Sequence, residues 1–165
     1  PRTSMASRRP SPNRLSAITV VTMARPVRSA ASPSSTSGAS GPAPGGWTIH
    51  EIIVHITDSE ANRYVRCRRL LTEPGSMVLG YDEAKWAQAL YYHEQSTEDA
   101  FQLFQWLRLT SYKLIKDAPE AVWSNTVQHS EEGVMTMDAW LGVYTRHVRD
   151  HIEQMEGVYQ DWLAR

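Results

Sequence analysis

Two histidines near the end of the chain have the spacing of a metal-binding pair. His147 and His151 are four residues apart, so on a helix their side chains lie one above the other on the same face. That face is otherwise apolar, with Tyr144, Val148 and Ile152. An H-x-x-x-H pair lets one helix offer two imidazole nitrogens to a single ion. The spacing also fits two core histidines that are hydrogen-bonded to neighbouring groups, since a buried polar group without a partner costs about 1–3 kcal/mol.

A third histidine could complete such a site. His55 lies at the edge of an apolar stripe that includes Ile52 and Ile56, whereas His50 falls on the opposite side of the same segment. Three imidazoles leave at least one coordination position of a divalent ion open, which distinguishes a reactive site from a closed structural one. His55 is therefore the candidate third ligand, although one histidine near a stripe can also arise by chance.

Glu60 and Arg63 also fall on the apolar stripe of the first predicted helix, three residues apart. They are predicted to form an inward ion pair near the metal site. They are candidates for a catalytic role, either by binding substrate or by orienting a ligand, and a structural ion pair is the favoured interpretation.

Other polar residues are given structural roles. His129 lies in the predicted loop before the last helix, where it could approach the mouth of the site, and a surface position is the favoured interpretation. Asp58, Asp150 and Glu153 project away from the apolar stripes and are expected to be solvated. Cys67 is predicted to be a buried packing residue.

Four helical segments must position these residues. The first has Thr48 as its predicted N-cap and Glu51 as the partner in a capping box. No convincing alternating strand pattern with turn residues appears. The fold class is predicted to be all-α, an antiparallel four-helix bundle. The predicted helices cover residues 48–71, 82–92, 97–116 and 136–163.

The chain changes in composition after residue 46. Residues 1–46 hold six Arg and no Lys, Asp or Glu, whereas residues 47–165 have a formal charge of −7. The first segment is rich in Ser, Pro, Ala and Gly and is predicted to be a disordered tail. It could be an organellar leader, a plain tail, or a non-native segment, and the abrupt change favours the last. Residues 47–165 are predicted to form one domain.

The overall composition excludes several classes of protein. The balance of 17 basic and 18 acidic residues argues against a nucleic-acid binder, which needs a cationic excess. No apolar run is long enough to span a membrane. The single cysteine excludes a disulfide framework, and with no signal-peptide pattern the expected location is cytoplasmic.

Two motifs resemble those of a known family. Residues 47–60 (WTIHEIIVHITDSE) resemble the opening of the DinB/YfiT-like superfamily of metal-binding four-helix bundles, and residues 133–155 resemble its closing helix. The resemblance covers residues 47 to about 160. It implies a divalent ion, commonly zinc or nickel, held by His55, His147 and His151.

The chain departs from the family pattern before Trp47. Family members usually have a long helix there, so the first helix of the bundle is expected to be missing or degenerate. Without it the bundle would expose apolar surface, form a homodimer, or recruit the short apolar segment of residues 15–23 as a replacement.

Two reactions follow from such a metal site. Metal-bound water can hydrolyse an ester or amide, or a low-molecular-weight thiol can bind the ion and attack an electrophile, as in the thiol-dependent S-transferases of the family. The thiol reaction is favoured because no inward general base is evident beyond Glu60. The expected partner is a small-molecule substrate. Two rival hypotheses are a non-catalytic metal-binding or stress-associated bundle, and a bundle without metal whose histidines bond to Glu60 and water.

Overall fold

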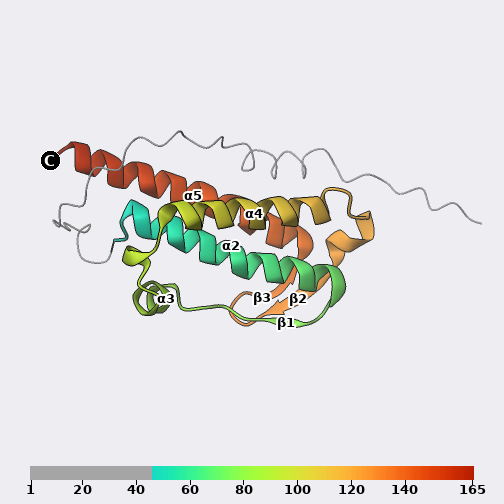
Figure 1. The fold of residues 1–165 in the computed structure, drawn as a ribbon. Helices are drawn as coiled ribbons and strands as arrows, with labels where there is room; N and C mark the ends of the chain where they lie inside the picture. Colours follow the sequence, from blue (N-terminus) through green and yellow to red (C-terminus); the bar gives the residue numbers. More distant parts are fainter. Residues whose placement is uncertain (1–45) are drawn as a thin grey trace, which may run out of the picture.

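The computed structural model describes residues 46–165. The predicted tail up to residue 45, the degenerate first helix and the segment of residues 15–23 therefore lie outside the described residues. Three long helices form the body of the described part: α2 (Ile49–Thr72), α4 (Thr97–Ile115) and α5 (Met137–Leu163). Figure 1 shows them side by side, with the short helix α3 (Glu83–Ala89) and a small sheet along one flank. The predicted helical bundle is confirmed.

Helix starts agree closely with the sequence signals. Thr48 Oγ1 accepts a hydrogen bond from the Glu51 amide at 3.2 Å, and the Glu51 carboxylate accepts one from the Thr48 amide at 2.9 Å. This is the predicted capping box, which supplies partners for backbone groups that the helix itself cannot pair. Side-chain N-caps also begin the other three helices, at Asp82, Ser96 and Thr136.

A small three-stranded sheet was not predicted. Its strands are β1 (Met77–Val78), β2 (Thr126–His129) and β3 (Gly133–Thr136). β1 pairs with β2 in parallel, and β2 pairs with β3 as an antiparallel hairpin. Strands of two to four residues are too short for a period-2 pattern to stand out. Two 3₁₀ turns, Tyr92–Glu94 and Glu120–Ser124, complete the described elements.

The apolar core lies mainly around the C-terminal half of α2. Cys67 is fully buried in it, as predicted, and burial raises the pKa of its thiol to about 12. A second cluster of Ile52, Ile56, Phe104 and Val148 packs nearer the start of α2. The main cluster also contains Leu70, Val78, Ile115, Ala118, Trp123, Val127, Met137, Trp140, Leu141 and Tyr144.

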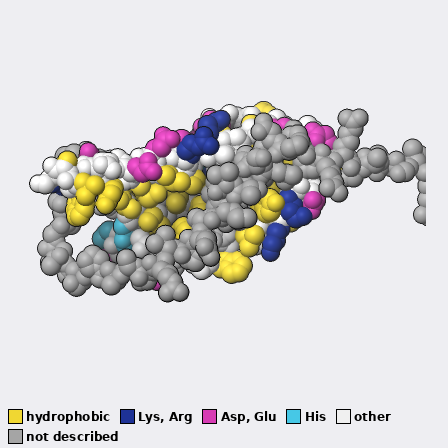
Figure 2. All heavy atoms as spheres, turned by 90° about the horizontal axis from the view of Figure 1, so that it is seen from above, with side chains coloured by type: hydrophobic (Ala, Val, Ile, Leu, Met, Phe, Trp, Pro, Cys, Tyr) yellow, Lys and Arg dark blue, Asp and Glu magenta, His cyan; other side chains and the backbone are white. Residues whose placement is uncertain are grey.

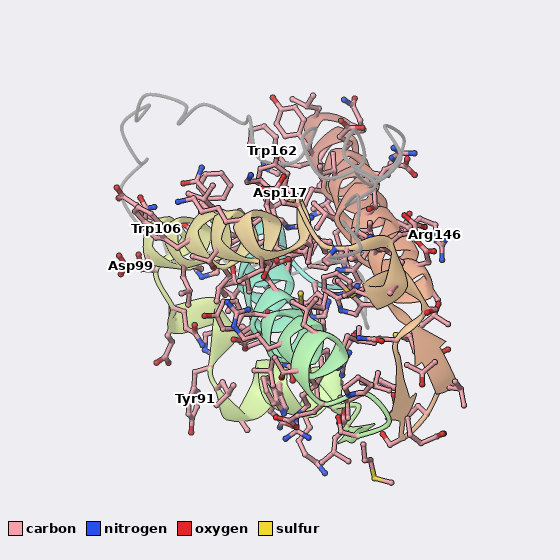
Figure 3. All side chains as sticks on the ribbon, turned by 90° about the vertical axis from the view of Figure 1, so that its right-hand side faces the viewer. Tyr91, Asp99, Trp106, Asp117, Arg146 and Trp162 are labelled. Carbon is pink, nitrogen blue, oxygen red and sulfur yellow. The ribbon has the colours of Figure 1, made fainter. Side chains whose placement is uncertain are left out.

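The apolar stripe of α5 is buried only along its first half. Ile152, which was predicted to lie on the apolar face, is 46% exposed, and Trp162 further along the helix is 65% exposed. α5 runs past the start of α2, so its last turns have no neighbour in the described bundle (Figure 1). Figure 2 shows the resulting band of hydrophobic side chains, with histidine atoms open to view beside it. Figure 3 labels Trp162 near the top of the view beside α5, and Trp106, which is 57% exposed, at the left end of α4.

Within residues 46–165, no helix combines the length and the apolar character needed to cross a membrane.

Candidate metal centre

The three predicted ligands lie together between two helices. His55 comes from α2, and His147 and His151 come from successive turns of α5. The His55 ring centroid is 5.4 Å from that of His147 and 4.7 Å from that of His151, and the two α5 rings are 4.5 Å apart. One ring nitrogen from each histidine can be chosen so that all three lie within 4.8 Å of one another. The residues that sequence spacing singled out therefore share one site.

His55 is buried without any hydrogen bond. Its side chain has no exposed surface, and neither ring nitrogen has a hydrogen-bond partner among the described residues. The Trp47 ring covers it, with centroids 4.4 Å apart. Burial, followed by the charges of His151 and Arg63, lowers the pKa of His55 to about 3. The imidazole is therefore neutral at neutral pH, with a nitrogen lone pair free to bind an ion.

The two histidines of α5 complete the donor set. Burial, followed by the nearby Arg63 charge, lowers the pKa of His147 to about 2. His147 Nε2 lies 3.5 Å from the Ser59 hydroxyl. His151 Nδ1 lies 2.7 Å from Gln154 Oε1, which leaves the other nitrogen of that ring for a ligand role.

These residues fit a divalent ion. A buried nitrogen without a partner costs about 1–3 kcal/mol, and His55 has two such atoms. Neutral imidazoles are good ligands for zinc, nickel and related ions. A metal ion would give one His55 nitrogen the partner that the described chain does not supply, so the alternative of histidines satisfied by Glu60 does not match the geometry at His55.

A carboxylate that sequence analysis missed lies beside the cluster. Glu83 Oε2 is 3.9 Å from His55 Nε2, and its side chain is half exposed. Glu83 is the first residue of α3, which Asp82 caps. Burial raises the pKa of the Glu83 carboxyl. No spacing rule could have linked it to the histidines, because α3 is joined to α2 through the short strand β1 and the loops on either side of it.

Glu60 is inward as predicted, but its partner is not Arg63. Its Oε2 lies 2.8 Å from Arg108 Nη2 and 3.1 Å from Arg108 Nε, and the Tyr144 hydroxyl donates to Oε1. The Arg108 guanidinium also lies 3.7 Å from the centroid of the Tyr144 ring. The predicted pair is wrong because α4 presents a second arginine directly opposite Glu60. Arg63 instead donates from Nε to Ser59 Oγ at 3.4 Å.

Two further expectations need correction. His129 is only 5% exposed rather than at the surface, because it lies in β2, and its Nδ1 accepts hydrogen bonds from the amides of Glu131 and Glu132. Asp58 is partly buried and accepts a hydrogen bond from the Tyr92 hydroxyl at 2.6 Å. Asp150 and Glu153 are exposed, as predicted.

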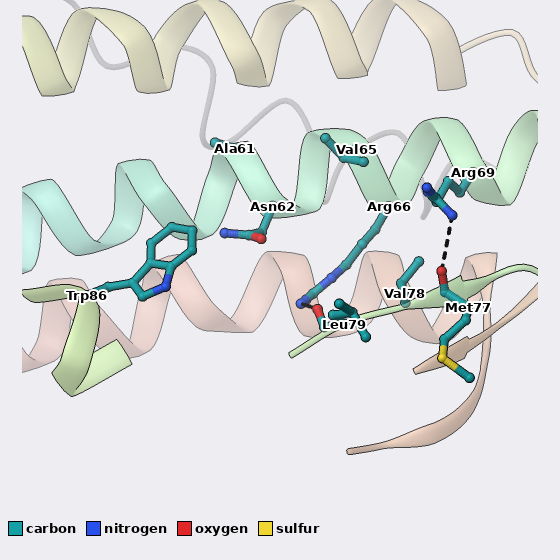
Figure 4. A pocket seen from close by; sticks show the side chains of 9 residues that line it. All are labelled: Ala61, Asn62, Val65, Arg66, Arg69, Met77, Val78, Leu79 and Trp86. Carbon is teal, nitrogen blue, oxygen red and sulfur yellow. Dashed lines mark hydrogen bonds between the residues drawn. The ribbon is translucent and has the colours of Figure 1, made fainter. Parts of the chain in front are cut away.

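A cavity of about 200 Å³ opens beside the cluster. Its wall includes Ser59, Arg63, Glu83, His129, Trp140 and His147. A second cavity, of about 580 Å³, lies between α2, β1 and Trp86 and contains none of the three histidines. Figure 4 shows Arg66 reaching across this second cavity, where its Nη2 donates to the Leu79 carbonyl, while Arg69 Nη1 donates to the Met77 carbonyl.

Fold and site together define a helical bundle that carries a three-histidine site between its helices. The chain belongs to the DinB superfamily, whose family model matches residues 11–155. That match begins inside the segment predicted to be a tail, and the boundary at residue 46 stays a prediction.

Two similar proteins have names that describe a metal-dependent protein. A protein of Oceanobacillus iheyensis is 29% identical over 120 residues, which cover 72% of this chain and 69% of the relative. One of Halalkalibacterium halodurans is 27% identical over 110 residues, or 67% of this chain and 64% of the relative. Both bear the name "putative metal-dependent hydrolase".

A solved structure shows the fold. YfiT from Bacillus subtilis superposes with a TM-score of 0.68 at 24% identity, over 72% of this chain and 68% of YfiT. It is described as "a probable metal-dependent hydrolase with an unusual four-helix bundle topology". At this identity the likeness shows that the two chains share a fold.

Proposed function

We propose that this chain is a divalent-metal-dependent enzyme that holds its ion with His55, His147 and His151. The observation that carries the proposal is the pair of His55 nitrogens, buried without partners next to two α5 imidazoles. When bound, such an ion lowers the pKa of a coordinated water toward about 7 or holds a thiol as thiolate. Zinc and nickel are among the ions that imidazole ligands suit.

Hydrolysis is the reaction that the neighbouring residues favour. Glu83 places a carboxylate oxygen 3.9 Å from His55 Nε2, beside the candidate ligands, where it could accept a proton from water. Glu60 is unsuited to that role, because Arg108 and Tyr144 already engage both of its oxygens. The names of the two curated relatives support the same class of reaction.

Thiol transfer is the second candidate. The cavity of about 200 Å³, which His147 lines, offers a place for a small thiol beside a candidate metal ligand. A metal thiolate needs no proton acceptor in the attacking step, so this reaction would not depend on Glu83. A small-molecule substrate suits either reaction. The cytoplasmic location and the homodimer expected from the sequence stay predictions.

Metal content tests the site directly. The protein is purified without a His-tag or chelator, beside His147→Ala and the control His93→Ala, whose side chain is exposed and does not belong to the cluster. We expect about one zinc or nickel ion per chain in the wild type and in His93→Ala, and none in His147→Ala. A folded wild type that takes up neither ion would refute the proposal.

Glu83→Gln separates the two reactions. The variant keeps the size of the side chain and removes the proton acceptor, so metal content should be unchanged. Hydrolysis should then fall by about 10²- to 10⁴-fold, whereas thiol transfer should be little affected. Metal without either activity would favour the non-catalytic, metal-binding alternative.

A further inference from the structure

Arg63 is a buried cation without a carboxylate partner. Its side chain is only 8% exposed, and no Asp or Glu among the described residues lies within ion-pair distance of it. Residues 1–46 contain no acidic residue that could serve instead. Burial lowers the pKa of Arg63 to about 10, so the guanidinium is still charged at neutral pH. A buried charge of this kind is costly unless something pairs with it.

The carboxylate that interacts electrostatically with Arg63, that of Glu60, is already bound to other groups. Glu60 is bound by Arg108 and by the Tyr144 hydroxyl, as described above. Glu60, Arg108 and Arg63 together therefore carry one net positive charge in the interior. An incoming anion would meet that surplus charge at Arg63.

Arg63 lies next to the candidate metal ligands. Ser59 Oγ is 3.4 Å from Arg63 Nε and 3.5 Å from His147 Nε2, so a single hydroxyl separates the guanidinium from the imidazole. Arg63 and His147 line the same cavity. Among the described residues the guanidinium makes one hydrogen bond, through Nε, which leaves its two terminal nitrogens for a ligand.

We infer that Arg63 binds the carboxylate of a small molecule whose other end reaches the metal site. The inference rests on the proposed function and adds the class of substrate. A planar guanidinium pairs with a carboxylate through two parallel hydrogen bonds, which fixes both the position and the orientation of the ligand. A cavity of about 200 Å³ limits the ligand to a small molecule.

The other charges around the cavity favour a monoanion. Glu83, Glu131 and Glu132 line it from exposed positions and outnumber Arg66, a second cation that lines it and interacts electrostatically with Glu131. Three carboxylates would repel a dianion such as a phosphate ester more strongly than a single carboxylate. The cavity therefore presents one buried cation to a small monocarboxylate.

Matched thiols test the anchor in the metal-loaded protein. 3-Mercaptopropionate and 2-mercaptoethanol can both bind a metal through sulfur, and only the first carries a carboxylate. We expect calorimetry to show the wild type binding 3-mercaptopropionate about 10- to 100-fold more tightly, the range for a hydrogen-bonded charge pair. The preference should disappear in Arg63→Met and persist in the control Arg69→Met, an arginine of the same helix that lines the other cavity. Equal affinity of the wild type for the two thiols would overturn the inference.

A second readout does not need the metal. Propionate is titrated into the chelator-treated protein while the indole signals of Trp140, which lines the cavity, are followed by NMR. We expect saturable shifts in the wild type and none in Arg63→Met. If the wild type takes up no metal, the proposed function fails, and this titration still decides the anchor, because absence of saturable shifts in the wild type would refute it.

Discussion

The metal-free protein should lose stability steeply as the pH falls below 6.5. His55 and His147 have folded-state pKa values of about 3 and about 2, against an ordinary value of 6.5, because burial disfavours their charged forms. At pH values between the folded-state pKa values and 6.5, the imidazoles bind protons in the unfolded chain but not in the folded chain. The free energy of unfolding is therefore fully retained above pH 6.5 and falls with pH until the folded-state pKa values are reached.

The size of the effect follows from these values. At pH 5.5 each histidine that stays neutral in the folded state lowers the free energy of unfolding by about 1.4 kcal/mol relative to neutral pH. Two such residues give about 3 kcal/mol. That is a large part of the roughly 5–15 kcal/mol that stabilises an ordinary domain.

Urea unfolding with chelator present, at pH 7.5 and pH 5.5, measures the loss. Other groups titrate in this range too, so the control is the double variant His55→Gln/His147→Gln, whose amides stay uncharged. We expect the wild type to lose about 3 kcal/mol more than the variant between the two pH values. A difference below about 1 kcal/mol would show that these imidazoles are not held neutral by burial.

Two further predictions concern stability and metal binding. Arg108→Leu removes the partner of the buried Glu60 and should lower the free energy of unfolding by about 3–5 kcal/mol in urea titrations. The double variant Glu60→Gln/Arg108→Leu should recover much of this loss. Wild-type stability of Arg108→Leu would contradict the ion pair. Adding metal at about 1,000 times its Kd should raise the unfolding free energy of the wild type by about 4 kcal/mol in calorimetric melts, with no increase in His147→Ala; an equal increase in both would place the ion elsewhere.

Local signals predicted the helices and the histidine cluster well. Thr48 and Glu51 specify the start of α2 through groups only three residues apart, and His147 and His151 share a face by helix geometry alone. His55 was found because it lies at the edge of an apolar stripe. These features depend on short separations along the chain, which a sequence shows directly.

Contacts between separate elements were harder to predict. The Glu60 partner is 48 residues away, and the choice between Arg63 and Arg108 depends on how α4 is rotated against α2. A signal existed, since Arg108 follows Phe104 by four residues and precedes Ile115 by seven, both of which are buried. Glu83 offered no such signal, because its approach to His55 depends on the path of the chain through β1 and its flanking loops.

Because Cys67 is buried, the protein's own thiol should not react in assays that follow an added thiol. It is the only cysteine in the chain, it has no exposed surface, and its pKa of about 12 leaves almost no thiolate at neutral pH. An electrophile added to the folded protein should therefore spare it. Consumption of that reagent then reports an added thiol, and slow alkylation of Cys67 measures how often the interior opens to solvent.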